Sequence, residues 1–243
     1  MVRAAPQVGN LQSRNVIKTE LHAHTDADPA DRIAHGVRSL VDHAAGLGYG
    51  AIAITLHDRY FEPADDARYA RERGVVLMAG IERTIRGRHI LLINFPADSA
   101  RIRDFDELAA LKAASPHGLV VAPHPFYPTP SALGARLMNA HAALIDAVEV
   151  NAMHTRVLDF NRRAIAWARA NHKPLVGNTD LHLLAQMGST YSMVDSPSDA
   201  NAICDAIRNG RVTVHATPLS SARAAHLFSL MCWGGIQGRL GRR

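Results

Sequence analysis

Short apolar runs of strand length alternate along the chain with segments in which apolar residues recur every three or four positions. The first pattern is typical of buried β-strands, and the second is typical of amphipathic helices. In residues 37–47, for example, Leu40, Val41 and Ala44 share one helical face, and Gly48 ends the segment. Strands are predicted at 16–21, 51–55, 75–81, 90–95, 118–122, 147–150, 174–177 and 212–214, and helices at 37–47, 65–73, 104–114, 132–140, 157–170 and 196–209.

This alternation favours an α/β fold whose parallel strands are buried on both faces. No linker, internal repeat or low-complexity segment interrupts residues 16–216, so one closed barrel is more economical than two domains. Residues 1–15 lack periodicity and are predicted to be a mobile leader. Residues 217–243 are predicted to form a C-terminal helix and tail that pack on the same domain.

Two of the predicted helices carry start signals. The segment from Asp104 to Glu107 has the spacing of a capping box. Ser196 is placed as an N-cap, with Pro197 at the first helical position.

Composition describes an ordinary globular protein, with 47% hydrophobic and 20% charged residues among 243. Cys204 and Cys232 give no disulfide framework, there is no secretion signal, and the apolar stretch 224–236 is too short to span a bilayer. A cytoplasmic protein without a membrane partner is therefore expected. The net charge of +5 favours anionic ligands, but no basic run exceeds two residues, so a dedicated nucleic-acid surface is not indicated.

The chemistry starts at the end of the first predicted strand, where His22 and His24 are separated by one residue. Residues two apart on an extended backbone point to the same side, so both imidazoles can face one point in space. Neutral imidazole is a common ligand of zinc, iron and manganese. By itself the pair is a weak signal and fits two solvated loop histidines better than a metal site.

The later strands end in the same way. The carboxyl ends of parallel barrel strands converge on one mouth, where catalytic groups of such folds lie. Any single one of these residues could be a solvated or capping side chain, but the joint pattern predicts a site. The residues that follow or lie on successive strands are His57, Asp58, Glu82, His89, His124, Glu149, Asn151, His154, Asp180 and His182. The remaining histidines are expected to be structural, namely His35, His43, His117, His141, His172, His215 and His226.

Five ordered segments resemble the motifs of the PHP (polymerase and histidinol phosphatase) family. They are Leu21 to Thr25, Ile54 to Asp58, Gly80 to Glu82, Ala122 to Pro125 and Thr179 to His182, and the resemblance runs from about Lys18 to His215. The resemblance implies a distorted (β/α)7 barrel. It also implies two or three divalent metal ions, usually zinc, manganese or iron, that hydrolyse phosphoesters.

Carried over onto this chain, the resemblance implies three groups of ligands, of which the first two share Glu82. The first metal would be held by His22, His24, Glu82 and Asp180, the second by Glu82, His89 and His124, and the third by His57, His182 and an acid of the first loop. Family members usually have Ser-Asp after the His-x-His-Thr segment. This chain has Asp26, Asp28 and Asp31 at different spacing, and Asp28 is narrowly preferred over Asp31.

The function expected from this resemblance is hydrolysis of a phosphate ester by a metal-bound hydroxide at a di- or trinuclear site. Glu82 and Asp180 would be catalytic through the metals. His154 could contact substrate or act as the general acid, and Arg83 and Arg156 are candidate phosphate ligands. The expected partner is a small phosphorylated substrate. The alternatives are a nuclease acting on ends of short nucleic acids, a non-catalytic binding module and, ranked low, an amide-cleaving amidohydrolase.

Overall fold

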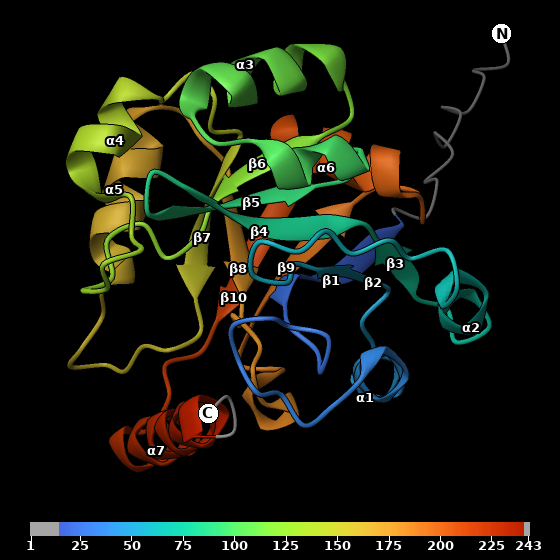
Figure 1. Ribbon diagram of the computed structural model, residues 1–243, viewed down its shortest axis with the longest axis vertical. Helices are drawn as coiled ribbons and strands as arrows, with labels where there is room; N and C mark the ends of the chain where they lie inside the picture. Colours follow the sequence, from blue (N-terminus) through green and yellow to red (C-terminus); the bar gives the residue numbers. More distant parts are fainter. Residues whose placement is uncertain (1–14, 241–243) are drawn as a thin grey trace, which may run out of the picture.

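The computed structural model describes residues 15–240, so the predicted leader, apart from Asn15, lies outside the described residues (Figure 1). The strands are β1 (Val16–Ala23), β2 (Ala51–Ile54), β3 (Val76–Met78), β4 (Gly80–Ile85), β5 (Arg88–Ile93), β6 (Leu119–Ala122), β7 (Ala147–Asn151), β8 (Leu175–Asn178), β9 (Thr190–Asp195) and β10 (Val212–Ala216). The α-helices are α1 (Val37–Gly46), α2 (Ala67–Arg71), α3 (Phe105–Ala114), α4 (Gly134–Ala140), α5 (Asn161–Ala170), α6 (Ala200–Arg208) and α7 (Ser221–Leu240), with short 3-10 helices at Ala97–Arg101 and Leu184–Gln186.

The strands form two five-stranded sheets, in the orders β10-β9-β1-β2-β3 and β4-β5-β6-β7-β8. Pairing is parallel within β1-β2-β3 and β6-β7-β8, but β4, β5, β9 and β10 pair antiparallel with their neighbours. The expectation of parallel strands throughout is therefore wrong. Between β4 and β5 the reason is local, because Arg86 and Gly87 both have positive φ and form a tight hairpin turn that reverses the chain.

The two sheets approach each other at isolated bridges. Ala23 pairs with Leu181 beyond β8, and His57 beyond β2 pairs with Glu82 on β4. The described strands thus make two sheets and no closed barrel, and the distorted (β/α)7 barrel remains a prediction.

The helices cover the outer faces of the sheets. In Figure 1, α1 and α2 lie beside the β1-β2-β3 end, whereas α3, α4 and α5 lie beyond the second sheet. Leu40 and Val41 of α1 pack with Ile52 of β2 and Ala23 of β1 in one apolar cluster. His22 of β1 and His24 directly after it lie on either side of Ala23 and point away from this cluster, toward Glu82 of the second sheet.

The structure agrees with one of the two predicted helix N-caps. Asp104 caps α3 by accepting from the backbone N–H of Asp106 and Glu107. The cap of α6 is wrong, since Asp199 rather than Ser196 accepts from the N–H of Ala202. The two observed caps, Asp104 and Asp199, are aspartates whose side chains accept from a backbone N–H two or three residues later, which is the geometry of an N-cap.

Helix α7 occupies part of the predicted C-terminal segment. Leu227 on α7 is 3% exposed, and Arg223 donates to the carbonyl of Ala185 at 2.8 Å. Leu219, just before α7, donates to the His154 carbonyl. No helix among the described residues has both the length and the hydropathy that a membrane span needs. The boundaries at 16–216 and 217–243 remain predictions.

Candidate metal centre

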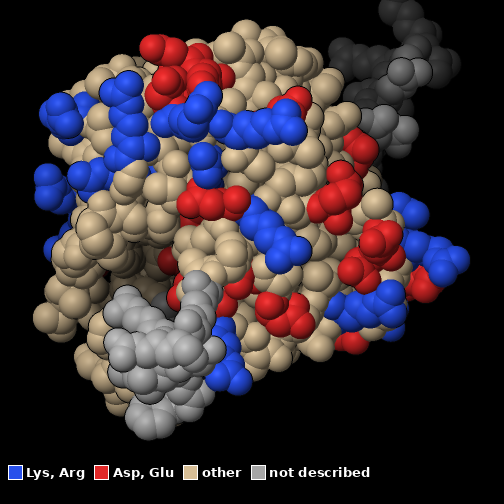
Figure 2. Space-filling model, in the orientation of Figure 1, with Lys and Arg blue, Asp and Glu red and all other residues tan. Residues whose placement is uncertain are grey.

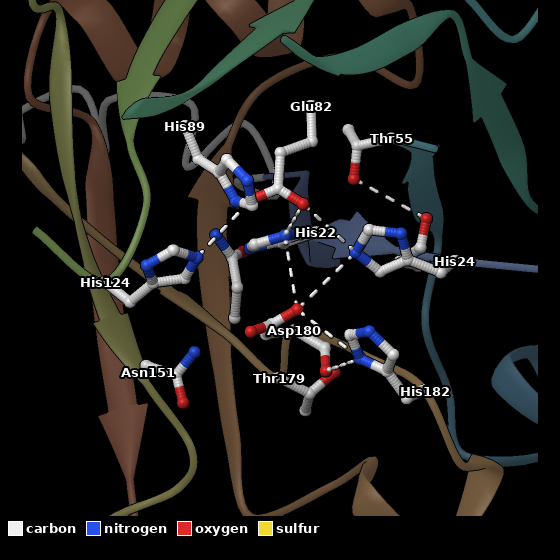
Figure 3. A network of polar contacts seen from close by, with 12 residues as sticks. His22, His24, Thr55, Glu82, His89, His124, Asn151, Thr179, Asp180 and His182 are labelled. Atoms are coloured by element: carbon white, nitrogen blue, oxygen red, sulfur yellow. Dashed lines mark hydrogen bonds and ion pairs between the residues drawn. The ribbon is translucent and has the colours of Figure 1, made fainter. Parts of the chain in front are cut away.

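The strand ends bring imidazoles and carboxylates together on the inner side of the sheets. Figure 3 shows His22, His24, Glu82 and Asp180 pointing toward one another, with His89, His124 and His182 around them. These residues come from β1, β4, β5 and the segments that follow β6 and β8. Groups of possible ligand atoms within 4.8 Å of one another are His22/His24/Asp180, His22/Glu82/His124, His57/Glu82/His89, His24/His57/His182 and Asp28/Asp31/His57. None of the seven histidines expected to be structural belongs to any of these groups of described residues.

Glu82 lies at the middle of the cluster, and its Oε2 faces three imidazoles. This oxygen is 3.3 Å from His22 Nε2, 3.4 Å from His24 Nε2 and 3.2 Å from His57 Nε2. Two ligands of one tetrahedral zinc ion, each about 2.0–2.1 Å from the metal, lie ~3.3 Å apart. The observed separations suit ligands that share a metal ion.

The other carboxylate oxygen of Glu82 faces a different pair of histidines. Oε1 is 2.6 Å from His89 Nδ1 and 3.3 Å from His124 Nε2. A carboxylate whose two oxygens face separate imidazole sets has the arrangement of a bridging ligand.

Asp180 completes the group around the two β1 histidines. Its Oδ1 is 3.3 Å from His22 Nε2 and 3.5 Å from both His24 Nε2 and His182 Nδ1. Asp180 has φ 53°, a left-handed conformation that is rare for a residue with a side chain.

Several polar atoms of the cluster are buried without a hydrogen-bond partner. They include His22 Nε2, His24 Nε2 and Glu82 Oε2. An unpaired buried polar group costs about 1–3 kcal/mol, so a cluster of them facing one another calls for a ligand. Imidazole nitrogen and carboxylate oxygen are the donor set of divalent zinc, manganese and iron, so these residues fit the predicted metals.

The charged groups of the cluster shift the pKa values of its side chains. Burial raises the pKa of Glu82, but the His22 charge and the close contacts with His124, His22 and His89 outweigh burial and hold this pKa well below its ordinary value. Burial lowers the pKa of His182, but its contacts with Asp31 and Asp180 raise this pKa to about 9. Without metal the cluster therefore carries protons that a cation must displace.

The first loop contains the three candidate acids, and the structure gives them different positions. Asp28 Oδ1 accepts from the N–H of Ala30 and Asp31, while Oδ2 accepts from the N–H of His57 and lies 2.9 Å from His24 Nδ1. Asp31 instead extends its Oδ2 to 3.2 Å from His182 Nε2 and 3.7 Å from His57 Nδ1.

The third acid, Asp26, belongs to none of these groups of possible ligands among the described residues and lies against Gly36. A Cβ added at Gly36 would be 3.1 Å from Asp26 Oδ2. Asp28 therefore orders the loop and orients His24, and Asp31 has the more available carboxylate.

The residues predicted to contact substrate lie outside the cluster. Arg83 donates to Asp58 Oδ1 and to the Ile102 carbonyl, both at 2.6 Å. Arg156 is exposed on the loop that follows β7. His154 is 6% exposed, and its Nδ1 lies 3.0 Å from the Asn151 carbonyl, so Nε2 is the free ring nitrogen.

Two buried glutamates support the cluster from behind. Glu149 was recognised only as a residue near a strand end, and Glu20 only as part of a strand; both are 0% exposed. Glu20 accepts from the His22 N–H and from Thr179, and burial raises its pKa to about 8. The two-residue spacing from Glu20 to His22 is not a usable signal, because the register of β1 is irregular between Glu20 and Ala23.

Two sheets with a histidine and carboxylate cluster at their strand ends define an α/β protein with a candidate polynuclear metal centre. A family model described as PHP-associated matches residues 159–212. A two-domain protein from Bacteroides vulgatus containing a predicted PHP-like metal-dependent phosphoesterase shares the fold with TM-score 0.65 and 18% identity, over 96% of this chain and 74% of that chain. The family match over residues 159–212 and the fold shared with this structure support the resemblance to the PHP family.

Other solved structures share the fold at similar identity. PsfC from Pseudomonas syringae aligns with TM-score 0.59 and 16% identity, over 92% of this chain and 99% of that chain. The lesion-specific endonuclease PfuEndoQ from Pyrococcus furiosus aligns with TM-score 0.57 and 18% identity, over 82% of this chain and 57% of that chain. The comparison with curated proteins finds no match.

Proposed function

We propose that this protein is a metal-dependent phosphoesterase with a di- or trinuclear centre. The observation that carries the proposal is the group of buried, unpaired atoms His22 Nε2, His24 Nε2 and Glu82 Oε2, which face one another at 3.3–3.4 Å. Such a group is costly in an empty protein and is satisfied by a divalent cation.

We assign the ligands of each ion from the contacts of Glu82 and of the first loop. The first ion would be held by His22, His24, Glu82 and Asp180, the second by Glu82, His89 and His124, and the third by His57, His182 and an acid of the first loop. For that acid the hydrogen bonds of Asp28 favour Asp31 as the ligand and Asp28 as the residue that orients His24.

Bound divalent ions would supply Lewis-acid stabilisation of a phosphoryl group and a nucleophile at neutral pH. The protein's own residues fix where this chemistry happens. Glu82 holds two imidazole sets on its two oxygens and so sets the spacing of the centre. Arg83 would reach a substrate phosphate only by exchanging its bond to Asp58. His154 donates its Nδ1–H to the Asn151 carbonyl, so its neutral ring would offer the Nε2 lone pair to the substrate, and only its imidazolium form could give a proton to the leaving oxygen.

A small phosphorylated molecule is the proposed substrate. Cleavage of a short nucleic acid is the second candidate, favoured by the distribution of charge. Figure 2 shows Lys and Arg side chains gathered on the upper left of this face, where α3, α4 and α5 lie in Figure 1. Phosphate backbones bind to such surfaces.

Elemental analysis and paired assays test the proposal. Protein purified without chelator is expected to contain two or three equivalents of zinc, manganese or iron. It is expected to hydrolyse a small phosphomonoester faster than a short single strand, with and without added manganese. A faster reaction on the strand would favour the nuclease, and bound metal without either activity would indicate a binding module. Protein free of metal and inactive in both assays would refute the proposal.

A further inference from the structure

Glu149 on β7 is fully buried behind the proposed centre, and each of its oxygens accepts two hydrogen bonds. Oε2 lies 2.8 Å from His22 Nδ1 and 3.1 Å from Asn178 Nδ2. Oε1 lies 2.9 Å from Asn151 Nδ2 and 3.2 Å from the backbone N of His124. An ionised carboxylate offers about four acceptor positions, and four donors fill them. Glu149 is therefore not available as a metal ligand.

We propose that Glu149 is the positioning residue of the centre. Its carboxylate fixes the ring of His22 so that Nε2 faces the first metal, and it holds His124 toward the second. The inference rests on the proposed metal centre and adds the residue that sets its geometry.

The first part of the argument concerns the tautomer of His22. A carboxylate can only accept, so His22 must donate its Nδ1–H to Glu149. The neutral ring then carries its lone pair on Nε2, which lies 3.3 Å from both Glu82 Oε2 and Asp180 Oδ1. A carboxylate that fixes the tautomer of a ligating histidine raises the metal affinity of that histidine.

The second part concerns the backbone of His124. This residue has φ 29°, an uncommon conformation that persists only where its surroundings hold it. Its N–H bond to Glu149 is one such restraint. His22 faces Oε2 of Glu82 and His124 faces Oε1, so Glu149 supports both sides of the proposed bridge.

The substitution Glu149→Gln separates positioning from simple burial. Glutamine keeps the shape but presents an amide NH₂ where two donors now point. If the NH₂ faces His22, the ring must accept at Nδ1 and carry its proton on Nε2, where it can no longer bind metal. If the NH₂ faces His124, the backbone N–H loses its acceptor.

Glu20→Gln is the matched control, because Glu20 is equally buried and lies two residues before His22 on β1. Its partners are the backbone N–H of His22 and the N–H and hydroxyl of Thr179, and it contacts no imidazole nitrogen. This variant changes a second fully buried glutamate without changing the acceptor of the His22 ring.

The experiment measures zinc affinity by competition with a chromophoric chelator, and the imidazole N–H resonance of His22 by NMR of zinc-loaded protein. In Glu149→Gln we expect zinc affinity to fall roughly 10–100-fold. We also expect the downfield His22 N–H resonance to shift or vanish. Glu20→Gln should keep the downfield His22 N–H resonance, because the acceptor of the ring is unchanged. Wild-type affinity together with an unchanged His22 resonance in Glu149→Gln would overturn the inference.

Two further outcomes keep the result decisive. If Glu149→Gln does not fold, the wild-type spectrum still decides, because a His22 ring without a proton on Nδ1 contradicts the inference and a hydrogen-bonded Nδ1–H supports it. If wild-type protein binds no metal, the proposed function itself fails, and the positioning role toward a metal fails with it.

Discussion

Replacing Glu82 by glutamine tests the bridge at the middle of the centre. The side chain of Gln has one acceptor oxygen where Glu82 has two. It can therefore serve the His22 and His24 side or the His89 side, but not both. The NH₂ group then points a donor at the other set. We expect Glu82→Gln to lose at least one metal ion completely rather than to weaken all of them slightly.

The magnitude follows from the contacts. Outer carboxylates that only orient a ligand change metal affinity by about 10–100-fold, and Glu82 faces the metal position itself, so a loss of at least ~100-fold is expected. At free zinc 100 times its Kd, binding to one site stabilises the folded protein by about 2.7 kcal/mol, which raises Tm by about 5–11 °C in a chain of this size. After a 100-fold loss the same zinc concentration gives about 0.4 kcal/mol, or about 1–2 °C.

Differential scanning fluorimetry with and without zinc, beside elemental analysis and phosphomonoester hydrolysis, measures these effects. Glu72→Gln is the control, since Glu72 is 63% exposed beside Arg68 at the end of α2, outside the cluster. It should leave metal content, the zinc-dependent Tm shift and hydrolysis unchanged. A Glu82→Gln protein with full metal content and the wild-type zinc shift would refute the bridging role.

Three other outcomes are expected. In the metal-free protein the contacts of His182 raise its pKa to about 9, so a cation must displace a proton from this ring. Metal affinity should therefore fall as the pH drops below about 9. A pH-independent affinity, measured by chelator competition, would contradict this. Asp31→Asn should remove one ion and leave the rest, whereas Asp28→Asn should disturb the whole loop and weaken more than one, as elemental analysis of both variants will show. Arg83→Gln should raise the KM for a phosphomonoester by about 10-fold or more without changing metal content. The reason is that one charge-assisted hydrogen bond to phosphate is worth about 1.5–3 kcal/mol. An unchanged KM would exclude the contact between Arg83 and the phosphate.

Strand ends could be predicted from the sequence better than the pairing of the strands. The run 75–81 is continuously apolar, yet the chain passes from β3 in one sheet to β4 in the other within it. Both strands are buried, so hydrophobicity does not mark the boundary. Gly80 marks it physically, because an added Cβ there would lie 2.7 Å from the Ile54 carbonyl oxygen. A single apolar run does not reveal such a close approach.

Strand β9 was missed for a different reason. Its inward residues Thr190 and Ser192 are buried but polar, and the Ser192 hydroxyl accepts from the N–H of Gly177. The alternation of buried and partly buried positions is regular, but it does not appear as an alternation of apolar and polar residues. A sequence pattern that relies on hydrophobicity does not detect a strand whose inner face is polar.

The types of ligand were predictable, and their supporting contacts were not. His22 and Glu82 lie on strands β1 and β4, and His24 and Asp180 lie close beyond β1 and β8, so the arrangement of the strands brings them together. The roles of Asp28 and Asp31 depend on which oxygen accepts which N–H within one short loop. Glu149 is separated from His22 by 127 positions, and nothing in its own segment indicates which ring it holds.

The buried carboxylates also explain how the strand ends keep unusual backbone conformations. His124 and Asp180 have φ 29° and 53°, and non-glycine residues in such conformations cost roughly 1–3 kcal/mol each. Glycine would relieve this strain but would remove a proposed ligand. Instead, Glu149 binds the N–H of His124, and Glu20 binds the N–H and hydroxyl of Thr179 immediately before Asp180. Each glutamate also bonds to His22, so the two strained positions are held to the same strand that carries the first pair of imidazoles. The arrangement of the centre is therefore set by hydrogen bonds that exist before any cation binds.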